Sequence, residues 1–286
     1  MPNHVTNILS FSGDEKEIKK ILKTIKGENF EDGTPRLIDF SKIIPFPEEL
    51  KGTISPTQIV TQEEYDEWMR KYNAGELNGY EKDNKPLTKE MSNEYKKKYG
   101  ADNWYDWRCA NWGTKWGAYE ISKGEGNSIV FQTAWSTPIP VIEKLSEMFP
   151  EVAITLEYAD EDFGHNCGII EFEGGGYEEI ESEGYDLANR ILCQVDGENA
   201  LETFMWQDED HLDGDYTQFV LKIMFEDFCQ PTNEALQELS EAHLEAMLNY
   251  VKGLEREDLK EYEALLHEIL DNKISFFTLP NEIKTN

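Results

Sequence analysis

The alternation of hydrophobic and polar positions predicts an ordered first half of the chain. Residues 4–11 place an apolar side chain at every second position, which is typical of a strand with one buried face. After Asp14, a residue type that favours helix N-termini, apolar residues recur every three or four positions through Ile25, which predicts a helix. Residues 51–110 are more polar and hold only short helix-like stretches, so we interpret them as an insertion.

A second set of strand and helix patterns follows the insertion. The predicted elements are strands at 111–122, 128–135, 152–158 and 167–172, and a helix that opens at Pro138 and ends at Phe149. With the first strand and helix, the order is strand, helix, two strands, helix, strand, plus one additional strand. This order predicts an α+β fold over residues 1–175, a ferredoxin-like antiparallel sheet with two helices on one face.

Three glycines, Gly174–Gly176, end the last predicted strand and indicate a domain boundary. Residues 177–286 then form an acidic C-terminal module, either α/β or mostly helical. Within it, residues 185–194 indicate a short helix and residues 217–228 are ambiguous. A helix that begins after Thr232 is followed by another, so we expect the chain to end in a helical hairpin.

The two helices of this hairpin share an apolar seam. The seam consists of Leu236, Leu239, Met247, Val251, Leu259, Leu266 and Leu270. A seam of this kind covers either its own domain or a second subunit. Because the module has few other large apolar residues, we expect a homo-oligomer that uses the seam.

The chain of 286 residues is folded but unusually acidic. It has 58 acidic and 27 basic residues and a net charge of −31, yet 39% of its residues are hydrophobic, which excludes a disordered acidic tail. No apolar run has the length of a transmembrane span or the arrangement of a secretory signal. The four cysteines, Cys109, Cys167, Cys193 and Cys229, have no paired spacing, so we expect mostly buried thiols in a cytoplasmic protein.

The negative charge is concentrated in one region. Between Glu151 and Asp215 there are 20 carboxylates and a single basic residue, Arg190. Such an array repels nucleic-acid phosphates, which argues against direct nucleic-acid binding, and it attracts basic surfaces. Two interpretations follow: a solvated face that keeps the protein soluble, or a surface for a basic partner.

Three stretches resemble a known family. They are Met1-Pro2-Asn3-His4-Val5-Thr6-Asn7, then Asn111-Trp112-Gly113-Thr114-Lys115-Trp116 with Ala118-Tyr119, and then Tyr158-Ala159-Asp160-Glu161-Asp162 followed by Gly164, Asn166 and Gly168. Together with Thr133-Ala134-Trp135 they are similar to the YubB-like family of plasmids, prophages and integrative elements, over residues 1 to about 175. The resemblance implies a mobile-element origin and a ferredoxin-like domain. It brings no established reaction, cofactor or catalytic residue.

Few residues are arranged for catalysis. Asp160, Asp162 and His165 are the candidate ligands of a divalent metal, as in a metal-dependent hydrolase or a nucleotide-handling enzyme. Consecutive carboxylates in a tight turn point in different directions, so at most two of them converge. No nucleophile motif, phosphate loop or iron–sulfur spacing is present. The four tryptophans near Arg108 and Lys115 fit core packing better than base stacking, because these are the only two cations beside them.

The sequence therefore predicts a non-enzymatic protein, without a cofactor, that binds and inhibits a host defence factor acting on nucleic acid. Two alternatives stay open: the metal-dependent enzyme, and a structural or accessory interaction protein of a mobile element. The predicted acidic surface comprises Glu157, Asp160, Glu161, Asp162, Glu178, Glu179, Glu181, Asp208, Glu209, Asp210, Asp213 and Asp215. Its predicted partner is a basic host protein of nuclease or helicase type, and we expect no membrane partner.

Overall fold

The computed structural model describes residues 2–197, 199–227 and 231–278. The chain divides into two compact units, Met1–Leu192 and Cys193–Asn286. The first unit holds a sheet with helices, and the second is helical in its described part. Each unit is described by itself.

A six-stranded antiparallel sheet organises the first unit. Its strands are β1 (His4–Ser12), β4 (Tyr119–Lys123), β5 (Ser128–Ala134), β6 (Ala153–Asp160), β7 (Cys167–Glu173) and β8 (Gly176–Ser182), and their spatial order is β4-β5-β1-β6-β7-β8. The central strand β1 pairs Leu9 with Ile129 of β5 and with Leu156 of β6. The four strands β4-β5-β1-β6 follow the ferredoxin-like plan, so the predicted fold class is confirmed.

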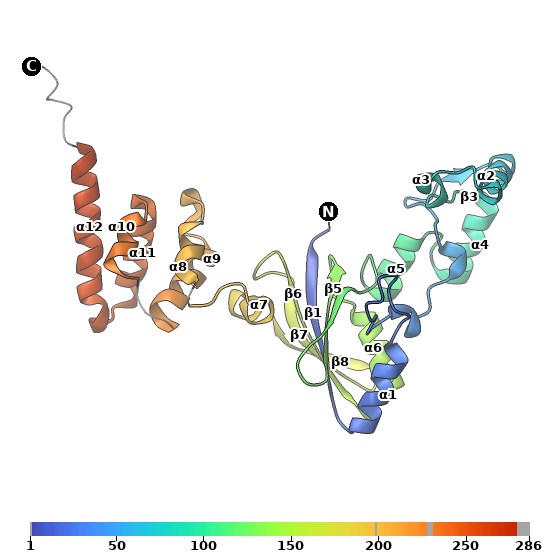
Figure 1. Ribbon diagram of the computed structural model, residues 1–286, viewed down its shortest axis with the longest axis horizontal. Coiled ribbons are helices and arrows are strands. Elements are labelled where there is room, and N and C mark those ends of the chain that lie inside the picture. Colours follow the sequence, from blue (N-terminus) through green and yellow to red (C-terminus); the bar gives the residue numbers. More distant parts are fainter. Residues whose placement is uncertain (1, 198, 228–230, 279–286) are drawn as a thin grey trace, which may run out of the picture. The chain divides into compact units, whose positions relative to one another are not determined.

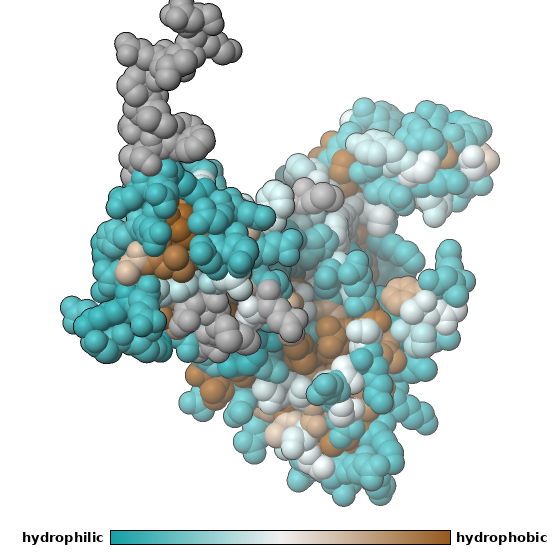
Figure 2. Space-filling view, turned by 60° about the vertical axis from the view of Figure 1, so that its left-hand side comes forward, coloured by the Kyte–Doolittle hydropathy of each residue, from teal (hydrophilic) through white to brown (hydrophobic). Residues whose placement is uncertain are grey.

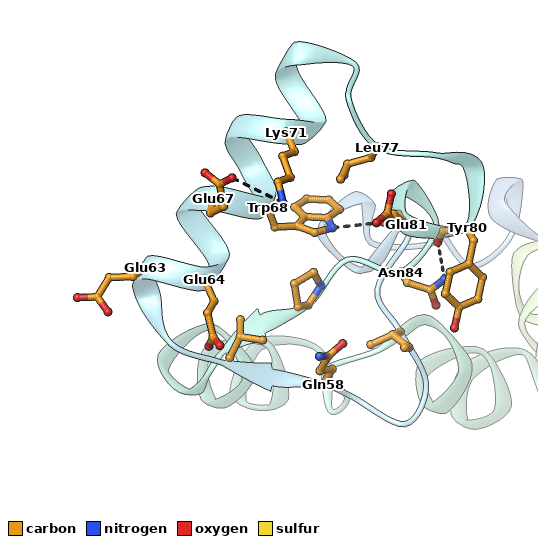
Figure 3. Close-up of a pocket in the computed structure, with 13 residues that line it drawn as sticks. Gln58, Glu63, Glu64, Glu67, Trp68, Lys71, Leu77, Tyr80, Glu81 and Asn84 are labelled. Atoms are coloured by element: carbon orange, nitrogen blue, oxygen red, sulfur yellow. Dashed lines mark hydrogen bonds and ion pairs between the residues drawn. The ribbon is translucent and has the colours of Figure 1, made fainter.

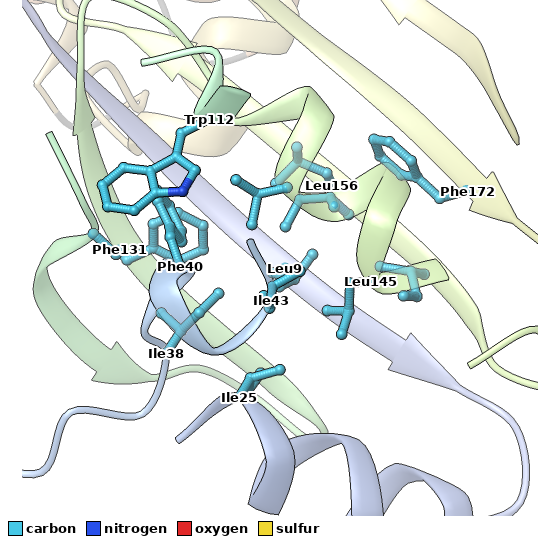
Figure 4. Packing of buried hydrophobic residues seen from close by; sticks show 14 of the residues in the cluster. Leu9, Ile25, Ile38, Phe40, Ile43, Trp112, Phe131, Leu145, Leu156 and Phe172 are labelled. Atoms are coloured by element: carbon cyan, nitrogen blue, oxygen red, sulfur yellow. The ribbon is translucent and has the colours of Figure 1, made fainter. Parts of the chain in front are cut away.

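Helices cover one face of this sheet and a short helix covers part of the other (Figure 1). On the first face, α1 (Glu15–Ile25), α5 (Trp104–Trp112) and α6 (Ile139–Met148) enclose a core (Figure 4) with the buried side chains Leu9, Ile25, Phe40, Phe131, Leu145, Leu156 and Phe172. On the second face, α7 (Tyr185–Leu192) packs Leu187, Ala188 and Ile191 against Ala159 and Cys167. Every second residue of β1 is buried, as its alternating pattern predicts.

The predicted insertion is a small substructure with its own helices. It contains two short parallel strands, β2 (Ile59–Val60) and β3 (Leu87–Thr88), and the helices α2 (Gln62–Ala74), α3 (Gly79–Lys82) and α4 (Lys89–Tyr99). The prediction of a strand at 111–122 is wrong at its start. Trp112 is buried at the end of α5, and Gly113, with φ of 76°, ends that helix in the left-handed region before β4 begins.

The first unit extends beyond the predicted boundary. Gly174 and Gly175, with φ of 57° and 87°, form a tight turn that returns the chain as β8 beside β7. These glycines close a hairpin, and α7 then packs on the sheet. The compact unit therefore reaches Leu192 rather than ending near residue 175.

The second unit is built from short helices and one long one. They are α8 (Ala200–Met205), α9 (Asp215–Lys222) with a π-helical turn at Ile223–Asp227, α10 (Asn233–Glu238), α11 (Glu241–Leu254) and α12 (Lys260–Thr278), with 3-10 turns at Glu209–His211 and Glu257–Leu259. The ambiguous segment after residue 217 is thus helical. The helix expected after Thr232 is interrupted, because Ser240 caps a new helix by accepting a hydrogen bond from the His243 amide at 3.3 Å.

The apolar seam is buried inside the second unit. Its residues are between 0% and 5% exposed in a single chain, and α11 packs against α12. Of the two interpretations of the seam, the structure supports the one in which it covers its own unit. The prediction that the seam serves as an oligomer surface is therefore wrong, because the helices of this unit already bury the side chains of the seam.

Hydrophilic side chains dominate the visible surface, and the hydrophobic areas on it are small (Figure 2). Across the described ranges no helix combines the length and the apolar character that a membrane crossing requires. Cys167 is buried and Cys109 half-buried, whereas Cys193 is exposed, contrary to its predicted burial. Cys229 lies outside the described residues.

Candidate partner-binding surface

Strand β8 forms an open, acidic edge of the sheet. It is last in the strand order, and within residues 2–197, 199–227 and 231–278 no strand pairs with its outer side. All seven of its residues are exposed. Tyr177 and Ile180 are 53% and 51% exposed although they are large and hydrophobic. We call Tyr177–Glu181 the β8 edge.

The carboxylates of the β8 edge point to both faces of the sheet. Glu178 lies opposite Glu171 of β7, on the face away from α6, and Glu179 lies opposite the buried Ile170, on the α6 side. Glu181 forms an ion pair with Arg190 of α7, with Nη2 and Oε2 3.1 Å apart. Like charges placed opposite each other, as in the first pair, weaken a sheet. A cation near Glu171 and Glu178 would reduce this repulsion.

A groove lies where β6, β7 and β8 run together. It has a volume of about 490 Å³, and its lining includes Glu171, Glu173 and Glu178. No basic residue is among the residues that line it. A lysine or arginine side chain inserted there would meet three carboxylates, which favour cations.

Asp160 does not belong to the acidic surface, contrary to its prediction. Its side chain is only 4% exposed and accepts hydrogen bonds from Asn3 Nδ2 at 3.0 Å, from the Asp162 amide at 2.9 Å and from Asn166 Nδ2 at 2.7 Å. Asn166 also donates to the carbonyl of Trp135 at 3.1 Å. The carboxylate therefore fixes the turn after β6 and ties it to the start of β1.

A second polar cluster lies beside this turn. His4 Nδ1 and the Tyr119 hydroxyl are 2.7 Å apart, and that hydroxyl donates to the carbonyl of Thr133 at 3.2 Å. Burial raises the pKa of Tyr119 to about 12, with contributions from Glu120 and Glu161, so its hydroxyl stays protonated. The stretches that carry the family resemblance thus meet at one end of the sheet, where they hold its strands in place.

The other carboxylates of the first unit lie in different surroundings. Glu157 is half-buried on β6, between Ile8 of β1 and Ile169 of β7. Glu161, Asp162 and His165 are exposed in the turn. Within the described part of the chain, no three side chains of the metal-ligating types come together. The candidate metal site at 160–165 therefore lacks its convergent third ligand, since Asp160 is held by three donors.

The remaining predicted acidic residues lie in the second unit. Asp208, Glu209, Asp210 and Asp213 are exposed in the segment between α8 and α9, and Asp215 is exposed at the first position of α9. Asp208 accepts a hydrogen bond from the Asp210 amide at 3.1 Å and lies 3.3 Å from His211 Nδ1. The predicted acidic surface is thus divided between two units: the β8 edge in the first, and this loop in the second.

Two of the clustered tryptophans are packed in the core as predicted, whereas Trp104 and Trp116 are half-buried. Trp107 and Trp112 are buried in the core, and their rings meet edge to face at 5.8 Å. Trp135 is 45% exposed and has φ of 71°, in the left-handed region that bulky residues rarely adopt. Lys115 Nζ lies 4.6 Å from its ring centroid and 4.8 Å from that of Trp116.

A larger pocket lies in the insertion, between α2 and α3 (Figure 3). Its volume is about 610 Å³, and the indole of Trp68 lies at its centre with Nε1 donating to the Glu81 carbonyl at 3.3 Å. Glu67 and Lys71 form an ion pair of 3.6 Å on the rim. Glu63, Glu64 and Glu81 also line this pocket, so carboxylates outnumber the single lysine there.

Sequence reasoning missed Tyr177, Ile180, Glu171 and Glu173 as parts of the site. Tyr177 and Ile180 lie in a stretch whose apolar residues have no strand period, because a bulge shifts the register between Ile169 and Ile170 of β7. The signal that could have found them is the triple glycine, which allows a hairpin as readily as a boundary.

A match to one protein-family model agrees with the fold. Residues 111–212 match the model of a family described as the ferredoxin-like domain in Api92-like protein. The matched segment differs from the predicted span of 1–175, and the match is to the Api92-like rather than the YubB-like description. The crystal structure of protein Api92 from Yersinia pseudotuberculosis has 12% sequence identity, a match that covers 64% of this chain and 99% of that chain, with a TM-score of 0.33. No curated protein matches the chain.

Proposed function

We propose that this chain is a non-enzymatic binding protein that docks on a basic protein partner through the β8 edge. The observation that carries the proposal is a fully exposed, acidic strand at an open sheet edge. Exposed edges are normally covered or blunted, because their free backbone groups pair with any extended segment. An extended basic segment that adds to β8 would gain backbone hydrogen bonds and charge-assisted contacts together.

The charge of the chain supports such a partner. At a net charge of −31, long-range attraction steers basic proteins toward it and speeds their association. Proteins that act on nucleic acid present basic grooves to phosphates. Together with the mobile-element origin that the YubB-like resemblance implies, this leads us to propose a host defence nuclease or helicase as the partner, inhibited when its groove is occupied.

The metal-dependent alternative has less support. To bind a cation, the Asp160 carboxylate would have to give up three hydrogen bonds. Without the bonds from Asn3 and Asn166, the turn after β6 would no longer be fixed. An accessory interaction protein of a mobile element would use the same surface without inhibiting anything. The two binding roles differ in whether the activity of the partner falls on binding.

The proposal is tested by capturing partners with the tagged chain and with a variant that carries E178Q, E179Q and E181Q. A matched control carries E63Q, E90Q and E94Q, three exposed glutamates of the insertion. We expect a basic, nucleic-acid-acting protein that the chain inhibits, with binding that weakens in high salt and in the β8 variant but not in the control. Equal binding by both variants, or insensitivity to salt, would reject the β8 edge, and binding without inhibition would favour the accessory role.

A further inference from the structure

An uncompensated cation lies at the edge of the core of this acidic protein. Arg108, on α5, is half-buried between three aromatic rings: its guanidinium carbon is 4.8 Å from the ring centroid of Phe46, 5.2 Å from that of Trp104 and 5.1 Å from that of Trp112. The two tryptophans precede and follow Arg108 by four residues, so one face of the helix holds all three. Among the described residues, no carboxylate forms an ion pair with Arg108.

A second arginine lines the same cleft. The cleft has a volume of about 450 Å³, and Arg36, Arg108 and Lys51 are among its lining residues. Arg36 Nη1 lies 3.6 Å from Asp39 Oδ2, beyond hydrogen-bond distance, and the other oxygen of Asp39 accepts the Ser41 amide at 3.0 Å. Lys51 is only loosely compensated by Glu48, at 3.9 Å. The cleft therefore has an excess of positive charge.

Both arginines carry unused hydrogen-bond donors. The Nε–H groups of Arg36 and Arg108 are buried and have no hydrogen-bond partner in the described part of the chain. Buried donors without a partner are rare in folded proteins and cost free energy. Burial lowers the pKa of Arg108, and the positive charge of the nearby Arg36 lowers it further.

The walls of the cleft are fixed before any ligand arrives. Trp112 Nε1 donates to the Ile44 carbonyl at 3.0 Å, and the Phe46 ring meets Trp107 edge to face at 5.3 Å. The side chain of Arg36 passes so close to Gly27 that a Cβ atom there would lie 2.7 Å from its Cδ. A site with fixed walls and placed donors binds with little loss of conformational freedom.

We propose that this cleft binds a small organic oxyanion, a phosphate or carboxylate, held between Arg36 and Arg108. Guanidinium groups bind such anions through paired N–H donors. The cleft volume lies within the range of small-molecule sites, so it holds an organic body as well as the anionic group. This inference is independent of the β8 edge and goes beyond the proposed function.

The test is a titration of the full chain that is monitored by tryptophan fluorescence, because Trp104 and Trp112 flank Arg108. The probes are inorganic phosphate, succinate and adenosine monophosphate, at constant ionic strength set with chloride. We expect saturable binding of at least one probe. Phosphate and the nucleotide binding without succinate would assign a phosphate ligand, and the reverse would assign a carboxylate.

Variants separate the cleft from general charge effects. R108Q and R36Q are each expected to weaken binding about tenfold or more, since each removes a charged donor pair, and R108K is expected to weaken it less. R70Q is the control, because Arg70 is exposed and paired with Glu67 and Glu76. If no probe binds saturably, or if R70Q weakens binding as much as R36Q and R108Q do, the proposal is overturned.

Discussion

Thr137 Oγ1 donates a 2.6 Å hydrogen bond to Oδ1 of Asn7, which precedes it by 130 residues. Asn7 is fully buried, and its amide also donates to the Val5 carbonyl at 2.8 Å and to Thr133 Oγ1 at 2.9 Å. One side chain thus joins β1, β5 and the turn before α6.

Replacing Asn7 with Ala should lower the free energy of unfolding by about 3 kcal/mol, because it leaves the buried Thr133 and Thr137 hydroxyls short of partners. Urea unfolding measures the effect. T6A, at a half-buried neighbouring position of β1, should cost less than about 1 kcal/mol. Similar losses for the two variants would show that the network adds nothing to stability.

Asp102 should make the first unit sensitive to acid. Burial alone would raise its pKa, but hydrogen bonds from Ser92, Thr57 and Lys96 outweigh burial and hold the pKa below the ordinary value of 3.8. A depressed carboxyl pKa stabilises the folded state above the unfolded value, and this contribution is lost as the pH falls through the folded value.

D102N should therefore cost about 2 kcal/mol at pH 7, and its difference from the wild type should shrink as the pH falls below 3.8. Urea unfolding at a series of pH values gives this difference. E90Q, at an exposed position of α4, is the control and should show neither effect. A constant difference from pH 7 to pH 2 would contradict the assignment.

Trp135 should be more tolerant of glycine than of alanine. At φ of 71° an L-residue is strained, whereas glycine adopts this conformation freely. W135G should thus be more stable than W135A by about 1 kcal/mol in urea unfolding. At Gln132, in β5 and without a positive φ, alanine should instead be more stable than glycine. If W135A were as stable as W135G or more stable, the backbone at Trp135 would not be strained.

L266A should destabilise the second unit by about 3 kcal/mol without changing the assembly state, because Leu266 is fully buried within its own unit. Thermal unfolding and sedimentation velocity measure the two quantities. E263A, one turn earlier on α12, is the matched control. A shift in molecular mass caused by L266A, with stability intact, would return the seam to its predicted oligomer role.

The fold could be predicted where a single hydrophobic periodicity extends along a whole strand or helix. The alternation of β1 and the helical spacing around Ile18 and Ile21 survive in the structure, because each pattern arises from one buried face. The start of β4 could not be predicted this way. The sequence pattern places Trp112 in a strand, yet it lies at the end of a helix and packs in the core. Its ring contacts Phe40, which is distant in the sequence.

The acidic surface could also be predicted only in part, because the sequence does not show which carboxylates have distant partners. Glu178, Glu179 and Glu181 are exposed as expected, since charged residues stay in water. Asp160 has the same chemistry but is buried, because Asn3 and Asn166, distant in sequence, supply its hydrogen bonds. The local sequence shows which residues are charged, whereas the burial of a carboxylate depends on hydrogen-bond partners that are distant in the sequence and adjacent only in the fold.

The open β8 strand also bears on how copies of this chain treat each other. An exposed edge is normally a route to self-association, because a second copy offers the same unpaired backbone. If two β8 strands met in antiparallel register, however, Glu178, Glu179 and Glu181 of each copy would face those of the other, and that repulsion opposes the pair. The same glutamates that would favour the proposed basic partner oppose pairing with a second copy, so charge would discriminate between that partner and this chain itself.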